Sequence, residues 1–553
     1  MSWLLDGGVV LAYFVVVIGI GLYKGRGSKT MEGFAVGNRD IPWWAVLASI
    51  LAAEISAATF LGAPAEGYAS RNFTYAQLAI GTILARVIVS CVFIKPYYDY
   101  RVVSIYEFLL IRFGARSKNG ASAIFLLTRA LAAGTRLYVA AVVLVIAYGM
   151  ITGLQPGPWQ QVEIYAAALA VLTAATALYT ALGGIKAVVW TDVIQATLMF
   201  GALGYAIFAL LHQIPGGVHG ALAALNGKKD LVFWDWHLNP NASFAGNVRG
   251  ILESEYTVWA AILASTFLTM ATHGTDQDMV QRMLTAKDHK RSRLALILSG
   301  LADFPIAICF LTVGILLWVH YHEPGKENPF AFYIMHEVPG GLRGLLIAGL
   351  FATAMGSLST ALNALATSFT EDWYLPYVRP DATPAQVVRV ARQSTLVFSI
   401  LLVLIGAATA YVAIVLKARV IPIVLGIMGY TYGSMLGVFL VGMLTKRRGS
   451  ERGNLLAMAC GFAAVFFFSG LHNDLWNLFH QSDPAFLHWQ ALHPDGPAFK
   501  HWQLSWMPAV AFPWRITIGT IVTFFTALCF RTPASQIALA EKHVATQKAL
   551  HPD

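Results

Sequence analysis

Charge is what this chain of 553 residues lacks most. Only 12% of its residues are charged and 57% are hydrophobic, whereas soluble globular chains carry about 25% charged residues. Over this length the shortage leaves too little polar surface to face water, which excludes a soluble multidomain enzyme. The same hydrophobicity excludes a disordered chain. The composition therefore predicts an all-α protein that crosses a lipid bilayer many times.

Cysteine is also scarce, with four residues at positions 91, 309, 460 and 529. Each lies in an apolar stretch without metal-ligand spacing, so we expect small core side chains rather than a disulfide or a metal site. We find no glycine-rich phosphate loop and no nucleophile–base arrangement, so we expect neither enzymatic activity nor a cofactor. The net charge of +9 does not indicate a nucleic-acid partner, because the basic residues lie in short loops between apolar runs.

About thirteen apolar runs are long enough to cross a bilayer, which requires about 20 helical residues. They cover residues 4–23, 42–68, 74–98, 122–150, 160–182, 188–212, 256–284, 292–320, 344–371, 390–415, 418–444, 453–470 and 513–530. Longer polar or aromatic loops are expected at 213–255, 321–343 and 471–512. Basic residues such as Lys24, Arg112 and Lys287 follow the first, third and seventh runs. Because lysine and arginine favour the cytoplasmic side, we predict a multi-pass protein of the plasma or inner membrane with its N-terminus outside and its C-terminus in the cytoplasm.

Two of the runs are interrupted, at residues 51–67 and 269–278. Each contains small residues, helix breakers and a carboxylate at membrane depth. Broken helices at corresponding positions of two five-helix halves are typical of inverted-repeat transporters that bind their substrate near the bilayer midplane. The alternative is that glycine and proline are simply frequent in membrane helices.

Oxygen atoms near the first interruption are candidates for binding a cation. A broken helix frees backbone carbonyls that need a partner inside the membrane, and a hard cation such as sodium prefers oxygen ligands. Ala52 and Ile55 lie where the helix loses its regular hydrogen bonds. The ninth run carries polar side chains on one face: Ser357, Ser359, Thr360 and Asn363. The alternative is that these hydroxyls bond back to their own helix.

Ionisable residues inside the runs are a second group of candidates, because a charge at the bilayer centre costs about 2.5–3.5 kcal/mol. Arg136 either pairs with a carboxylate of the protein or receives a substrate carboxylate through its two-pronged guanidinium. Glu54 either balances a cation or titrates, which would indicate proton coupling. His273 and Asp276 lie around the second interruption, where a ligand would contact unwound backbone. Two others are expected to be structural partners: Arg282 and Asp303.

Several motifs together resemble the sodium:solute symporter family. Residues 183–195, with the sequence GGIKAVVWTDVIQ, resemble its signature. Three other segments resemble its broken helix, the partner helix and the sodium-binding helix: 42–56, 276–282 and 359–372. The resemblance implies a LeuT-like core of inverted five-helix repeats over 42–445. It leaves a first helix and cytoplasmic loop at 1–41, and two peripheral helices, an extracellular loop and a cytoplasmic tail at 446–553.

The resemblance also implies a sodium site between the second and ninth runs. The positions that match the family's ligands are Ala52, Ile55, Thr353, Gly356 and Ser357. Gly356 is a departure, because the family has a hydroxyl there. We expect either weaker sodium binding or a water molecule in place of that hydroxyl, with the Thr353 hydroxyl compensating in part. Some relatives bind a second sodium ion at positions that match Asp192, Ser359 and Thr360.

The substrate is expected to be a small organic solute that is imported by alternating access with sodium. The expected contacts are Glu54, Thr59, Arg136, His273, Asp276, Gln277 and Asn363. Residues 62–68 resemble the monocarboxylate, vitamin and iodide branch, whereas 275–277 resemble sugar transporters. Arg136 favours an organic anion, and a sugar or polyol is the alternative. A proton-coupled carrier, a passive facilitator and a membrane sensor on a transporter-like core are further alternatives.

Overall fold

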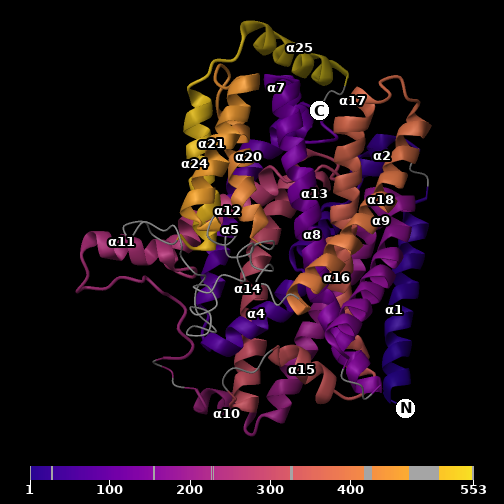
Figure 1. The fold of residues 1–553 in the computed structure, drawn as a ribbon, viewed down its shortest axis with the longest axis vertical. Coiled ribbons are helices and arrows are strands. Elements are labelled where there is room, and N and C mark those ends of the chain that lie inside the picture. The colour runs from indigo at the N-terminus through magenta and orange to yellow at the C-terminus, as the bar shows by residue number, and fades with distance from the viewer. Residues whose placement is uncertain are drawn as a thin grey trace.

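Long apolar helices make up the computed structural model, which describes residues 2–26, 29–152, 156–225, 227, 229–323, 328–415, 426–471 and 510–550 (Figure 1). Within these ranges, nine helices are long and apolar enough to cross a membrane, or ten when one bent pair counts as a single span. The predicted all-helical membrane fold is therefore confirmed. Most of the loop expected at 471–512 and the start of the run at 418–444 lie outside the described residues.

The helices that match the predicted runs are α1 (Ser2–Lys24), α5 (Leu78–Val89), α8 (Ala115–Thr152), α9 (Pro158–Gln213), α14 (His289–Tyr321), α16 (Leu342–Phe369), α18 (Pro384–Ile414), α20 (Ile427–Leu444), α21 (Glu451–Phe468) and α24 (Phe512–Leu528). Broken spans are formed by α3 (Trp43–Glu54) with α4 (Ala57–Ser70) and by α12 (Ser265–Gly274) with α13 (Gln277–Met283). Shorter helices connect or cover them, including α2 (Met31–Val36), α6 (Lys95–Asp99), α7 (Tyr106–Phe113), α10 (Gly217–Ala223), α11 (Phe244–Glu253), α15 (Pro329–His336), α17 (Leu375–Tyr377) and α25 (Ala534–Leu550).

The difference from about thirteen predicted runs has a structural explanation. α9 covers two runs and departs from helical geometry at Gly184, where φ is 59° and ψ is −153°. A Cβ placed on Gly21 of α1 would lie 2.8 Å from Tyr179 Cβ and 3.1 Å from Thr191 Cγ2. Residues twelve apart lie about 18 Å from each other in a straight helix, so the chain doubles back at Gly184. The other differences are the run at 256–284, which is divided into short helices, and α24, which has only 17 residues.

The first predicted interruption separates α3 from α4, whose axes differ by 65°. Ile55, at the break, has φ −82° and ψ 95°, which is extended rather than helical. Ser56 then begins α4 as its N-cap, and its hydroxyl accepts from the Thr59 amide at 3.4 Å. The sequence change from apolar residues to Glu-Ile-Ser therefore ends one helix and starts another inside the span.

The second predicted interruption lies at Thr275 and Asp276, between α12 and α13. Asp276 caps α13, with its carboxylate accepting from the Asp278 amide at 2.9 Å. The carbonyls that the break exposes are partnered by tyrosines: Tyr97 donates to Gly274 at 2.5 Å, and Tyr106 donates to Thr275 at 3.4 Å. The predicted pair of broken helices is therefore present.

The four cysteines differ from expectation. None forms a disulfide, but Cys91 and Cys529 are exposed and the other two are half-buried, so the prediction that they are core side chains is wrong. An apolar run in a membrane helix has one side toward the bundle and one toward lipid, and sequence hydrophobicity alone does not separate the two.

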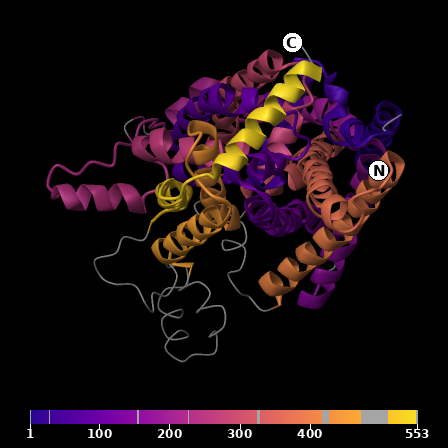
Figure 2. The ribbon, with the colours of Figure 1, turned by 90° about the horizontal axis from the view of Figure 1, so that it is seen from above.

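The two ends of the bundle are distinct. α1 begins at the end opposite to the one that α25 covers (Figure 1), as an odd number of crossings requires. Figure 2 shows α25 lying across its end of the bundle. Gln536 of α25 donates to the Ile111 carbonyl at 2.8 Å, and His543 lies 3.2 Å from the Tyr100 carbonyl.

α1 is fixed to the start of α16 by one buried carboxylate. Asp6 of α1 accepts from the amides of Gly341 at 2.6 Å and Gly344 at 2.9 Å, and from Arg343 Nε at 2.7 Å. The free amides at the start of α16 and the arginine charge are thereby satisfied together. Since α16 is almost entirely buried, this contact fixes one end of the most enclosed of the candidate membrane spans.

We expect Asp6→Ala to lower the melting temperature of the purified protein, because removing one partner of a buried ion pair costs about 3–5 kcal/mol. The matched control is Asp40→Ala. Asp40 is 60% exposed and pairs with Lys186, and an exposed pair contributes about 1 kcal/mol or less. Equal melting temperatures for the two variants would show that α1 docks through apolar packing alone.

Candidate ion and solute site

The end of α3 places backbone carbonyls in the centre of the bundle. Because α3 stops at Glu54, its last carbonyls have no following helical amide as a partner. Ala52, Ala53 and Ile55 are all buried. The Ala53 carbonyl accepts from the Ser357 hydroxyl of α16 at 3.2 Å, so the break faces the hydroxyl-bearing helix as the sequence suggested.

The positions on α16 that match the expected sodium ligands lie against this break. A Cβ placed on Gly356 would be 3.0 Å from the Ala52 carbonyl oxygen. Thr353 is buried, but its hydroxyl donates to the Leu350 carbonyl of its own helix at 2.7 Å. The Thr353 hydroxyl is thus already engaged, which weakens the expectation that it replaces the hydroxyl missing at Gly356.

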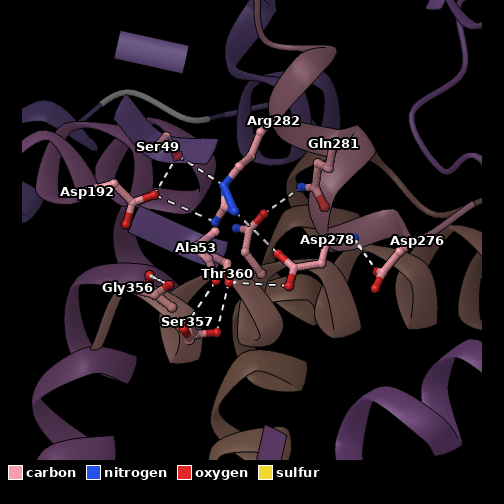
Figure 3. Close-up of polar contacts among 12 residues, drawn as sticks. Ser49, Ala53, Asp192, Asp276, Asp278, Gln281, Arg282, Gly356, Ser357 and Thr360 are labelled. Atoms are coloured by element: carbon pink, nitrogen blue, oxygen red, sulfur yellow. Dashed lines mark hydrogen bonds and ion pairs between the residues drawn. The ribbon is translucent and has the colours of Figure 1, made fainter. Parts of the chain in front are cut away.

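The second group of expected ligands is differently arranged (Figure 3). Asp192 accepts from the Ser49 hydroxyl at 2.5 Å and lies 3.6 Å from Arg282 Nη2. The Thr360 hydroxyl is engaged by the Ser357 carbonyl at 2.8 Å and by Asp278 at 3.4 Å rather than by Asp192. The Ser359 hydroxyl donates to the Gly356 carbonyl at 3.1 Å. A guanidinium therefore supplies a positive charge beside Asp192.

A chain of buried charges continues from Asp192 through the second broken helix. Arg282 lies 3.6 Å from Asp278, as Figure 3 shows, and Asp278 also pairs with Arg129 of α8. Arg129 Nη1 is 3.3 Å from Asp276, which in addition accepts from the Tyr432 hydroxyl at 2.9 Å. The network ties α8, α9, α13 and α20 together, and it confirms no ligand role for any of its members.

Glu54 belongs to a separate buried cluster. It pairs with Arg86 and lies 3.0 Å from His273 Nε2. Arg86 is fully buried and also pairs with Asp303 at 2.8 Å and with the Ser299 hydroxyl at 3.1 Å. The end of the first broken helix is therefore held to α5, α12 and α14 by charge.

A cavity of about 410 Å³ lies beside both breaks. Four of the expected substrate contacts line it: Glu54, Arg136, His273 and Asp276. Tyr75 and Phe512 also line it, and they lie next to the 229–256 segment through the Tyr75–Tyr256 ring contact and the Ala511–Leu252 backbone bond. The cavity therefore runs from the helix breaks toward the end of the bundle that carries this loop.

Arg136 differs from Arg515, the other cavity arginine without an ion pair to a described residue, because Arg515 donates to the Tyr430 hydroxyl at 2.8 Å. Within the described parts of the chain Arg136 forms no ion pair, and its one hydrogen bond is to the Met428 sulfur at 3.5 Å. The carboxylate pairs that the sequence suggested for Arg136 are made instead by Arg86 and Arg129. The Arg136 donors thus face a cavity that can admit an acceptor.

The other expected contacts are not among the residues that line this cavity. Gln277 accepts from the Ile105 amide at 2.8 Å and donates to the Val103 carbonyl at 3.0 Å. Asn363 accepts from Gln281 at 2.5 Å. Thr59 lies in the first turn of α4, 3.5 Å from the Ser56 hydroxyl. In this conformation the three side chains form hydrogen bonds with other groups of the protein and do not contact the cavity.

Arg86, Arg129 and Tyr432 are site residues that the sequence did not single out. For Arg129 a signal was available, because it lies seven residues before Arg136 and so on the same face two turns away. Arg86 lies inside the apolar run 74–98, so the criterion that selected Arg136 also applied to it. Nothing in the local sequence marks Tyr432, since its partner Asp276 lies on another segment.

Comparison with known proteins identifies the family. A model of the sodium:solute symporter family matches residues 34–461. The chain is 26% identical to the sodium/sialic acid symporter SiaT of Proteus mirabilis over 79% of this chain and 84% of that protein. It is also 26% identical to the human sodium/iodide cotransporter, over 79% of this chain and 65% of that protein. It is 26% identical to the human sodium-coupled monocarboxylate transporter 1 as well, over 83% of this chain and 72% of that protein.

Among solved structures, a substrate-bound outward-open state of a Na+-coupled sialic acid symporter matches with a TM-score of 0.74 and 21% identity, over 95% of this chain and 97% of that chain. This likeness supports the LeuT-like arrangement expected from the sequence. The matched family model covers most of the chain, including both helix breaks and α16. The chain belongs to the sodium:solute symporter family and is a sodium-coupled solute symporter rather than an enzyme.

Proposed function

We propose that this symporter imports a small organic anion, and that Arg136 binds the carboxylate of that anion. The observation that carries the proposal is the Arg136 guanidinium, which lines the cavity without an ion-pair partner among the described residues. A guanidinium offers five donors in a fork that fits a carboxylate. A charged group inside a bilayer is costly unless it meets a partner or water, so a substrate carboxylate would stabilise it.

The rest of the cavity wall favours an anion that also bears hydroxyl groups. Thr269, Thr272, His273 and Asp276 line the same space as Arg136, and these side chains can donate to or accept from hydroxyls. Named relatives include sialic acid, monocarboxylate and iodide symporters. Iodide is a weak hydrogen-bond acceptor and has no donor to offer the wall, so a hydroxylated carboxylate fits the wall better than iodide does.

For sodium we propose the site between the first break and α16, formed by Ala52, Ile55, Thr353 and Ser357. The support is the contact between Ser357 and the Ala53 carbonyl and the approach of Gly356 to Ala52. A second cavity of about 20 Å³ is lined by both Ser357 and Arg136. An ion that draws α16 onto the broken helix would therefore shape the wall next to Arg136, which couples ion and solute binding.

We further propose one sodium ion per cycle. Arg282 already places a positive charge 3.6 Å from Asp192, and a second cation there would face like-charge repulsion in a region of low dielectric constant. The proposed orientation keeps the N-terminus outside, so the cavity opens to the extracellular side and solute import follows by alternating access.

Replacing Arg136 by glutamine should weaken solute binding at least about tenfold, because the charge-assisted hydrogen bonds to the carboxylate are lost. Thermal shift of the purified protein against sialic acid, short hydroxy acids, neutral sugars and iodide, each with and without sodium, provides the measurement. The matched control is Arg116→Gln, which changes an exposed arginine of the same helix. A neutral sugar that stabilises wild type and Arg136→Gln equally would contradict the anion proposal.

Replacing Ser357 by alanine should raise the dissociation constant for sodium about tenfold, because a ligand oxygen is removed. Sodium titration of tryptophan fluorescence, with choline keeping the ionic strength constant, measures this. Ser399→Ala is the control, since Ser399 bonds only to Leu396 of its own helix, at 2.7 Å, among the described contacts. Sodium-independent uptake that follows a proton gradient would contradict sodium coupling and would make Glu54 the candidate for a proton-binding group.

Coupling one sodium ion to a monovalent anion moves no net charge. Uptake into proteoliposomes should therefore show a sodium Hill coefficient near 1 and should not respond to an imposed membrane potential, which otherwise contributes about 2.3 kcal/mol per charge per 100 mV. Uptake of a monocarboxylate that rises with an inside-negative potential would contradict the single-ion proposal and favour a second ion at Asp192, Ser359 and Thr360.

A further inference from the structure

Gly356 leaves the proposed sodium site one side-chain oxygen short, and another residue of the chain approaches the same point. A Cβ placed on Gly356 would lie 3.0 Å from the Ala52 carbonyl oxygen and 3.2 Å from Gln195 Oε1. Both distances are tighter than ordinary contacts of a Cβ. The absence of a side chain at 356 is therefore what allows two oxygens, from α3 and α9, to converge on this point.

Gln195 is buried without a satisfied amide. It is 1% exposed, and neither Oε1 nor Nε2 makes a hydrogen bond of ordinary geometry within the described part of the chain. The Tyr13 and Tyr179 hydroxyls interact with the amide through looser side-chain hydrogen bonds. An unsatisfied buried polar group costs about 1–3 kcal/mol, so an oxygen held in this state next to a freed carbonyl indicates a ligand that meets it when bound.

We propose that Gln195 Oε1 is a sodium ligand in this protein and takes the place of the hydroxyl that Gly356 lacks. The inference rests on the proposed sodium site. Side-chain amide oxygens are suitable ligands for hard cations, as are backbone carbonyls. The pairing of a glycine at 356 with a long amide at 195 keeps an oxygen at the site while moving its source from α16 to α9.

This assignment changes what sodium binding connects. With a hydroxyl at 356, the ion would join only the broken helix and α16. With Gln195 as a ligand, the ion also joins α9, three residues after Asp192. Asp192 in turn contacts Ser49 of α3 and Arg282 of α13, so the ion would be linked directly to the helix that holds both broken spans.

The test is a sodium titration of purified full-length protein, with choline replacing sodium and with tryptophan fluorescence and melting temperature as readouts. Gln195→Leu keeps most of the side-chain volume but removes the oxygen, and it should raise the sodium dissociation constant about tenfold. Gln195→Glu keeps an oxygen at the position and should bind sodium at least as tightly as wild type. Gln393→Leu, an exposed glutamine of α18, is the control and should not differ from wild type.

A second pair of variants keeps the test decisive if Gln195→Leu does not fold. Gly356→Ser alone should weaken sodium binding, because its Cβ would crowd Gln195 Oε1 and the Ala52 carbonyl and displace one of them by a few tenths of an ångström. Combining it with Gln195→Ala makes room for the new hydroxyl, so the double variant should recover to within about threefold of wild type.

The outcomes separate this inference from the proposed site. If Ser357→Ala weakens sodium binding and Gln195→Leu does not, the sodium site stands and the role of Gln195 is overturned. If neither variant changes sodium binding, the site itself is wrong. A double variant that binds sodium more weakly than Gly356→Ser alone would also overturn the exchange of one oxygen for the other.

Discussion

Backbone carbonyls exposed inside a membrane need partners, and that constraint organises this structure. Each broken span frees such carbonyls, but the two breaks are resolved differently. At the second break, the hydroxyls of Tyr97 and Tyr106 occupy the carbonyls of Gly274 and Thr275. At the first break, Ser357 reaches Ala53, and Ala52 faces the gap at Gly356. The two breaks therefore differ in how their freed carbonyls are partnered: tyrosines occupy those of the second break, whereas the Ala52 carbonyl of the first break lies against a glycine.

Buried charge obeys a similar constraint. Arg86, Arg129 and Arg282 each form an ion pair with a carboxylate from another helix. These ion pairs connect the helices around the breaks and leave the cavity unfilled. Arg136 is the exception among these four arginines. The substrate of a transporter supplies contacts that the protein's own side chains leave unmade. A guanidinium that faces a cavity without an ion pair leaves such contacts for an anion.

Much of the architecture was accessible from sequence because membrane helices must satisfy their own backbone. Long apolar runs therefore predicted spans, and small residues with a carboxylate predicted both breaks. The lack of an ion pair at Arg136 among the described residues was not accessible, because a carboxylate on any neighbouring helix would have looked equally suitable. The compensation at Gly356 was also missed: Thr353 lies on the same helix and was the local candidate, whereas Gln195 is distant in sequence.

The sequence by itself determined that the chain is a membrane-spanning helical protein, where its helices break, and which family it resembles. These properties follow from local composition, since hydrophobic length and backbone hydrogen bonding act within a single segment. Only the tertiary structure decided which charges pair, which hydroxyls are already engaged and which side chains face the cavity. Those outcomes depend on distances between helices. A shift of two residues, about half a turn, is enough to exchange a cavity-facing position for a packed one.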